Sequence, residues 1–105
     1  GSAVPSGEAR PPTGFDDTEY AGLQGYVTKA LDELQAVDAA ALNDRAGQSV
    51  VFKMGSNELP FTAENYMLSF SLPNFYFHAT TAYDILRMKG VPLGKMDFLG
   101  QLRMG

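Results

Sequence analysis

The segment from Ala63 to Lys89 constrains this chain most, because it is apolar around almost its whole circumference. At helical spacing one stripe consists of Phe75, Ala79, Ala82 and Leu86. Other faces carry Phe70, Phe77, Ile85 and Met88. A helix that is apolar on all sides is normally buried on all sides. What the chain can fold into therefore depends on how much of this helix its other elements can cover.

Local signals mark the ends of this helix and one interruption. Thr62 can cap its beginning, and Gly90 followed by Pro92 is a stop signal. Pro73 lies in the interior, where proline removes a backbone hydrogen bond and strains the preceding turn. We therefore expect a kink or a restart of the helix within residues 71–74.

Two helices and a β-hairpin are predicted before this segment. Asp16 and Glu19 resemble a capping box, and apolar residues then recur at three-and-four spacing from Tyr20 to Val37, which predicts an amphipathic helix. Asp38 can cap a shorter helix that runs from Ala39 to about Arg45. Gly47 would give that helix a left-handed exit.

The hairpin is predicted from β-branched and aromatic residues on both sides of a turn. Residues 49–54 and 58–62 read as strands, and Gly55, Ser56 and Asn57 supply the turn. Pro60 has no N–H group and belongs on a sheet edge or at a strand end. We expect the hairpin to be an accessory to the helices.

The first fourteen residues are interpreted as lying outside the fold. Gly1 and Ser2 look like the remnant of a cleaved tag, and the stretch up to Gly14 is rich in proline and glycine. We expect residues 1–14 to be a tag remnant and flexible linker, and residues 15–105 to be a single helical domain.

These elements are too few to cover the apolar helix. One amphipathic helix, a short helix and a hairpin cover about two of its faces, whereas a closed bundle needs four comparable helices. The predicted fold is therefore mainly α: an incomplete helical bundle. We expect a homodimer, or a missing N-terminal helical pair supplied by another polypeptide, to close it.

Composition excludes several kinds of partner. The formal net charge is -4 and the pI is about 4.7, which argues against a nucleic-acid surface. Cysteine is absent from the sequence, which removes thiolate metal sites and thiol nucleophiles and fits a cytoplasmic protein. No uninterrupted apolar run is long enough for a membrane span, so we expect a soluble chain.

Two long blocks of sequence resemble a known family. Residues 72–87 and 90–100 look like the C-terminal signature of an uncharacterised domain-of-unknown-function family grouped with the DinB/YfiT-like four-helix bundles. Residues 6–8, 15–17 and 50–52, with Leu23, are also similar to it. The resemblance implies that members are longer, and that this chain corresponds to the C-terminal half to two-thirds of one.

The same resemblance raises the question of a metal. DinB-like relatives often bind a divalent metal through three histidines, two of them four residues apart on one helix. His78 is the only histidine in this sequence, and Ala82 stands four residues on. One imidazole cannot form a three-ligand site, so we predict no metal and no cofactor.

The best candidate site is a polar stripe on the apolar helix. Asn74, His78 and Thr81 share a face, and Tyr83 could add a hydroxyl to a ligand pocket. The simpler interpretation is that these side chains satisfy one another, or a partner helix, in an interior. The sequence thus favours an assembly or small-ligand-binding module. The alternative is a DinB-like enzyme, dependent on a metal or a thiol cofactor, with its site near His78.

Overall fold

The computed structural model describes residues 3–11, 14 and 16–105. The chain divides into two compact units, Gly1–Phe70 and Ser71–Gly105, and each is described by itself. The tag remnant predicted at Gly1 and Ser2 lies outside the described residues.

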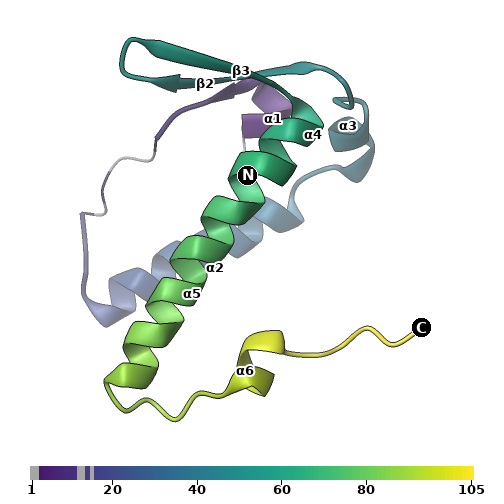
Figure 1. Ribbon diagram of the computed structural model, residues 1–105. Coiled ribbons are helices and arrows are strands. Elements are labelled where there is room, and N and C mark those ends of the chain that lie inside the picture. The colour runs from purple at the N-terminus through teal and green to yellow at the C-terminus, as the bar shows by residue number, and fades with distance from the viewer. Residues whose placement is uncertain (1–2, 12–13, 15) are drawn as a thin grey trace. The chain divides into compact units, whose positions relative to one another are not determined.

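The first unit contains a small sheet and several helices (Figure 1). Its elements in order are α1 (Ala3–Ser6), β1 (Glu8–Ala9), α2 (Tyr20–Gln35), α3 (Ala39–Asn43), β2 (Ser49–Met54), β3 (Asn57–Thr62), α4 (Ala63–Asn65) and the π-helical segment η1 (Tyr66–Ser71). The second unit consists of α5 (Leu72–Met88) and α6 (Lys95–Leu99).

The predicted hairpin is confirmed, with a tighter turn than expected. β2 and β3 are antiparallel, and Met54 pairs with Asn57, so Gly55 and Ser56 alone form the loop. The sheet order is β1-β2-β3, which makes β3 an edge strand. Pro60 lies in that edge strand opposite Val51, where a missing N–H group is tolerated.

A third strand lies in the stretch that was interpreted as a linker. In β1, Glu8 and Ala9 pair in parallel with Val51 and Phe52 of β2. Val4 and Ala9 are both buried. Residues 3–9 are therefore part of the folded unit, and the flexible-linker prediction is wrong for them.

The predicted fold class, a mainly α incomplete helical bundle, is also wrong. The hairpin is not an accessory, because its strands form two-thirds of a three-stranded mixed sheet that holds much of the core. The long helices hold none of it, since neither α2 nor α5 has a buried residue. The fold is mixed α/β. The sheet was underestimated because its third strand forms only when residues 8–9 pair with the distant strand β2, and helical periodicity does not indicate such pairing.

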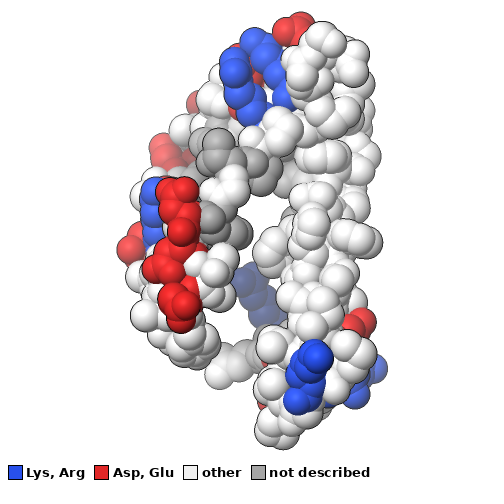
Figure 2. All heavy atoms as spheres, turned by 90° about the vertical axis from the view of Figure 1, so that its left-hand side faces the viewer, with Lys and Arg blue, Asp and Glu red and all other residues white. Residues whose placement is uncertain are grey.

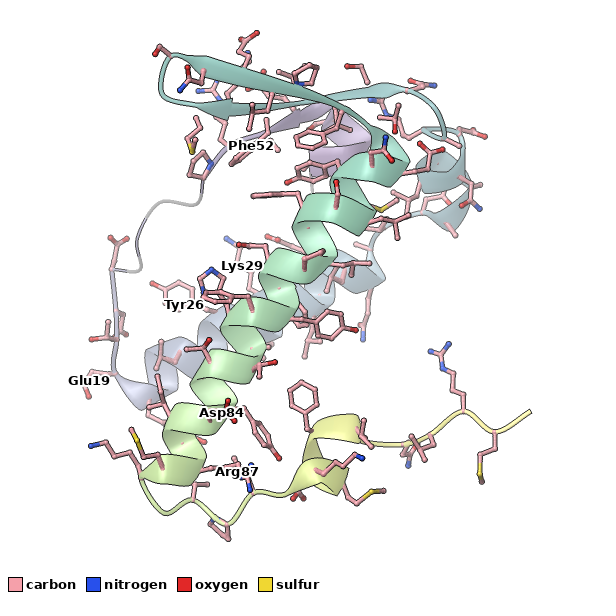
Figure 3. All side chains as sticks on the ribbon, in the orientation of Figure 1. Glu19, Tyr26, Lys29, Phe52, Asp84 and Arg87 are labelled. Carbon is pink, nitrogen blue, oxygen red and sulfur yellow. The ribbon has the colours of Figure 1, made fainter. Side chains whose placement is uncertain are left out.

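The core lies between the sheet and the beginning of the helix that follows it. It consists of Val4, Ala9, Val50, Phe52, Ala63 and Tyr66. Val50 is 0% exposed. The Phe52 ring, labelled in Figure 3, lies 4.8 Å from the Phe70 ring between centroids, and Tyr66 lies 5.6 Å from Phe70. Aromatic contacts of this kind stabilise a small core beyond the area that they bury.

Arg45 ties the N-terminal segment to the rest of the first unit. Its Nε donates to the carbonyl of Val4 at 3.0 Å, and its Nη2 donates to the carbonyl of Ser49 at 2.8 Å. Gly7 passes close to this guanidinium with a φ of +75°. A Cβ at Gly7 would lie 2.8 Å from Nη2 of Arg45, so the site requires glycine in both conformation and space.

Most predicted helix ends are confirmed. The Asp38 side chain caps α3 by accepting from the N–H of Ala40, and the Thr62 side chain caps α4 by accepting from the N–H of Asn65. The start of α2 differs from the prediction, because the helix begins at Tyr20 and no side chain caps it. Instead, the N–H of Glu19 donates to Oδ1 of Asp17 at 2.8 Å, which forms a local turn before the helix.

The interruption predicted at Pro73 takes the form of a wider turn. η1 ends at Ser71, and Pro73 lies in the first turn of α5, where its missing N–H costs little. At the other end of α5, the N–H of Gly90 donates to Arg87 and that of Val91 donates to Leu86. This is a Schellman motif, which confirms the predicted stop.

Within the second unit, the segment that follows α5 folds back and packs onto it. The Tyr83 hydroxyl donates to the carbonyl of Gly94, and the Tyr83 and Phe98 rings meet edge to face at 5.1 Å. α6 is therefore held to the C-terminal half of α5.

Candidate functional site: two uncovered helices and a groove

α5 presents large apolar side chains to solvent along its whole length. None of its residues is buried, and Phe75 and Phe77 are 63% and 67% exposed. Figure 2 shows this helix as a surface that is uncharged over most of its length, with charged side chains near its C-terminal end. Monomers rarely leave an apolar surface of this extent uncovered.

α2 has an apolar stripe that is also uncovered. The stripe, at three-and-four spacing, consists of Tyr20, Leu23, Val27, Leu31 and Leu34, and all five side chains are exposed. The polar side of the helix carries Lys29, Asp32 and Glu33. This is the pattern of a helix whose apolar face has a partner.

The residues predicted to form a site all lie on α5. Asn74, His78 and Thr81 share an exposed face of the helix. Thr81 donates to the carbonyl of Phe77 at 2.7 Å, and the His78 ring meets the Phe77 ring edge to face at 5.2 Å. Tyr83 is half-buried, and its hydroxyl is used in the contact with Gly94. Their role in binding stays a prediction.

The side chains present do not fit the metal site that a DinB-like resemblance implies. Within residues 3–11, 14 and 16–105, no three histidine, cysteine, aspartate or glutamate side chains gather into a group that could hold a metal ion. His78 is the single histidine of the sequence, and Ala82 occupies the position one turn on. We therefore derive no chemistry through a metal.

Two titratable groups of the first unit are shifted by their surroundings. Hydrogen bonds from Lys53 and then Arg10 lower the pKa of Glu8, and Lys53 Nζ lies 2.8 Å from Glu8 Oε2. Burial raises the pKa of Tyr66. Both groups belong to the packing of the sheet: Glu8 lies in β1 and Tyr66 in the core.

A groove at the end of α2 was not predicted from the sequence. It has a volume of about 470 Å³ and is lined by Pro5, Glu33, Ala36, Val37, Asp38, Ala41 and Leu42. Figure 3 labels Lys29, one turn before Glu33 on the same helix. Pro5 and side chains of residues 33–42 create this space, and no motif marks them.

In the described part of the chain, no helix is both long and apolar enough to cross a membrane.

Comparison with known proteins relates the chain to a domain family and to solved structures. No curated protein matches it. It is similar to a crystal structure of a DinB family member protein from Shewanella denitrificans, with a TM-score of 0.73 and 30% identity. The match covers 90% of this chain but 53% of that one, so the chain spans about half the length of this relative.

The family match is nearly as long as the chain. Residues 2–99 match the family described as a domain of unknown function, DUF1993. Because the match includes the N-terminal residues, it gives no support to the prediction that the chain is only the C-terminal part of a member. The chain belongs to the DUF1993 family, and it shares its fold with a DinB family member.

Proposed function

We propose that this chain is an assembly module whose exposed helices, α2 and α5, are covered by a second copy of the chain. The observation that carries this proposal is that neither long helix has a buried residue. The folded core of the described residues lies in the first unit, around the sheet.

The single apolar stripe of α2 is not enough to cover all the apolar sides of α5. α2 has one apolar stripe and can cover one side of a neighbouring helix. α5 has apolar residues on opposite sides, for example Phe75 and Phe77, which point about 160° apart at 3.6 residues per turn. At least one large apolar side of α5 therefore needs a further partner.

Covering these side chains supplies enough free energy for stable association. Fully burying a large apolar side chain contributes about 1.5–3 kcal/mol. Phe75, Phe77 and Met88 are each more than half exposed, so burying the exposed part of each is worth about 1–2 kcal/mol. With the stripe of α2 added, the gain is comparable to the cost of about 4–15 kcal/mol for associating two chains, so a complementary geometry gives stable association.

A second copy is the occupant that we favour. Symmetric dimers are the commonest assemblies of soluble proteins, and a shared two-fold axis would let each α5 meet an equivalent apolar partner. The DinB family member to which the chain is similar is nearly twice as long in one polypeptide, so two copies provide a comparable amount of chain. A helical pair from another polypeptide is the other occupant. The proposed location is the cytoplasm.

A pair of substitutions tests the proposal. Ala82→Glu places a charge in the stripe of α5 that contains Phe75 and Leu86, whereas Ser56→Glu places the same charge in the loop of the hairpin, outside α2 and α5. Both positions are exposed, so neither change disturbs the described core. Molar mass by light scattering should fall to that of one chain for Ala82→Glu and stay at two for Ser56→Glu.

Two results would contradict the proposal. One is a mass of a single chain for the unsubstituted protein at all concentrations. The other is an equal effect of the two glutamate variants, because a non-specific effect of charge would not distinguish α5 from the hairpin.

The alternative function, a DinB-like enzyme near His78, has less support. The likeness to a DinB family member favours it, but His78 lies on an exposed face and belongs to no group of three metal-ligating side chains in the described residues. Purified protein that binds one equivalent of a transition metal, and loses it in His78→Ala with unchanged circular dichroism, would favour the enzyme.

A further inference from the structure

The groove at the end of α2 is formed by three elements of the first unit. The C-terminal end of α2 and the residues after it form one wall, α3 forms another, and Pro5 of α1 adds to the lining. Its volume of about 470 Å³ is within the range of small-molecule sites. The apolar lining consists of Pro5, Ala36, Val37, Ala41 and Leu42.

The polar side chains in the lining are both carboxylates. Glu33 comes from the last turn of α2, and Asp38 comes from the cap of α3. Asp38 Oδ1 accepts from the N–H of Ala40 at 3.1 Å, as the cap of α3. Lys29 Nζ lies 3.9 Å from Glu33 Oε1, and both side chains are largely exposed, so this pair is weak.

The groove does not belong to the surface that assembly would cover. Glu33 follows Leu31 by two residues and precedes Leu34 by one, which places it about 100° around the helix from Leu34 at 3.6 residues per turn. It shares the polar side of α2 with Lys29. A partner seated on the apolar stripe would therefore leave the groove open to solvent.

We propose that this groove binds a small organic cation, in which an ammonium or amidinium group is attached to a compact apolar body. The apolar body contacts Val37, Ala41 and Leu42, and the cationic group lies between the carboxylates of Glu33 and Asp38. An apolar pocket with a few placed polar groups is the usual design of a small-ligand site, and two acidic groups select a positive charge. This inference goes beyond the proposed assembly and does not rest on it.

The test compares two ligands that differ in charge. Benzylammonium and benzyl alcohol have the same size, and each is titrated into the full chain while amide chemical shifts are followed by NMR. Benzylammonium should shift the amides of Val37, Ala41 and Leu42. Each exposed ion pair contributes at most about 1 kcal/mol, a factor of about five, so with two carboxylates the alcohol should bind up to about thirtyfold more weakly.

Three variants make the test specific. Asp38→Asn keeps the cap, because asparagine caps helices as well as aspartate does, while it removes the charge. Combined with Glu33→Gln, it should abolish the preference for the cation. Glu58→Gln removes one carboxylate from the hairpin, at a distance in the sequence from the groove, and should leave the preference unchanged.

The outcomes separate this proposal from its alternatives. Equal affinity for the ammonium and the alcohol, or shifts spread over α2 and the hairpin alike, would overturn it. So would a loss of preference in Glu58→Gln as large as that in the double variant, since general charge attraction would then explain the binding. The mass of the protein is measured in the same samples, so a failure of assembly is recognised separately.

Discussion

Replacing Gly7 by alanine should destabilise the first unit more than the same change at Gly47 or Gly25. Gly7 has a φ of +75°, which costs an L-residue about 1–2 kcal/mol. The new Cβ would lie 2.8 Å from Nη2 of Arg45 and 3.3 Å from the carbonyl oxygen of Ser49. If the guanidinium moves away, its bond to Ser49 weakens, which adds about 1–2 kcal/mol.

Two matched variants divide this cost into its parts. Gly47 has a φ of +72° but nothing within 4 Å of a Cβ, so Gly47→Ala measures the backbone cost alone. Gly25 lies inside α2 with open space around it, so Gly25→Ala should stabilise the chain by about 0.5–1 kcal/mol. The expected order of destabilisation is Gly7→Ala at about 2–4 kcal/mol, then Gly47→Ala at about 1–2 kcal/mol.

The assay is urea denaturation followed by circular dichroism, with all variants at one protein concentration because association changes apparent stability. Equal losses in Gly7→Ala and Gly47→Ala would show that Arg45 does not crowd Gly7. A neutral Gly7→Ala would refute the conclusion that residues 3–9 belong to the folded unit.

Two further predictions concern the sheet and the helix that follows it. Hydrogen bonds from Lys53 and Arg10 depress the pKa of Glu8, so its contribution to stability is present above its unfolded value near 4.5 and is lost as the pH falls through the folded value. As the pH falls below about 4.5, the urea midpoint of Glu8→Gln should therefore change less than that of the unsubstituted chain. If the two plots of midpoint against pH are parallel, the ion pair does not contribute to stability. Thr62→Ala should cost about 1 kcal/mol because the side chain of Thr62 accepts from the N–H of Asn65 at 3.2 Å, whereas Thr62→Ser should keep most of that stability; equal losses would argue against the cap.

Local signals in the sequence predicted the local structure well. The turn at Gly55, the caps at Asp38 and Thr62, and the stop at Gly90 each depend on residues within a few positions of one another. Turn geometry and orphan backbone groups are determined over that range, so the sequence is sufficient to predict them.

The sheet was missed because its third strand depends on a distant partner. Glu8 pairs with Val51, and a two-residue strand has no periodicity of its own. The prolines around it gave the stretch the composition of a linker. Gly7, with its carbonyl accepting from the N–H of Val51, is the residue that directs the chain into the sheet, but its role is visible only once Arg45 and β2 are in place.

Of the two candidate sites, one was predictable from the sequence and the other was not. The sequence was sufficient to predict that α5 has apolar residues on opposite sides, because helical spacing alone determines which residues share a side. The groove could not, because Pro5, Glu33 and Leu42 meet only through the fold. Periodicity reports what a helix needs to bury, whereas a cavity depends on how separate elements leave space between them.

Molar mass in solution tests the central claim most directly. Size-exclusion chromatography with multi-angle light scattering, over a hundredfold range of concentration, should give twice the chain mass of 11.4 kDa at the upper end and dissociation only on dilution. A compact species of 11.4 kDa at every concentration, with the amides of α2 and α5 protected from hydrogen exchange, would contradict the account, because one chain would then have covered both helices by itself.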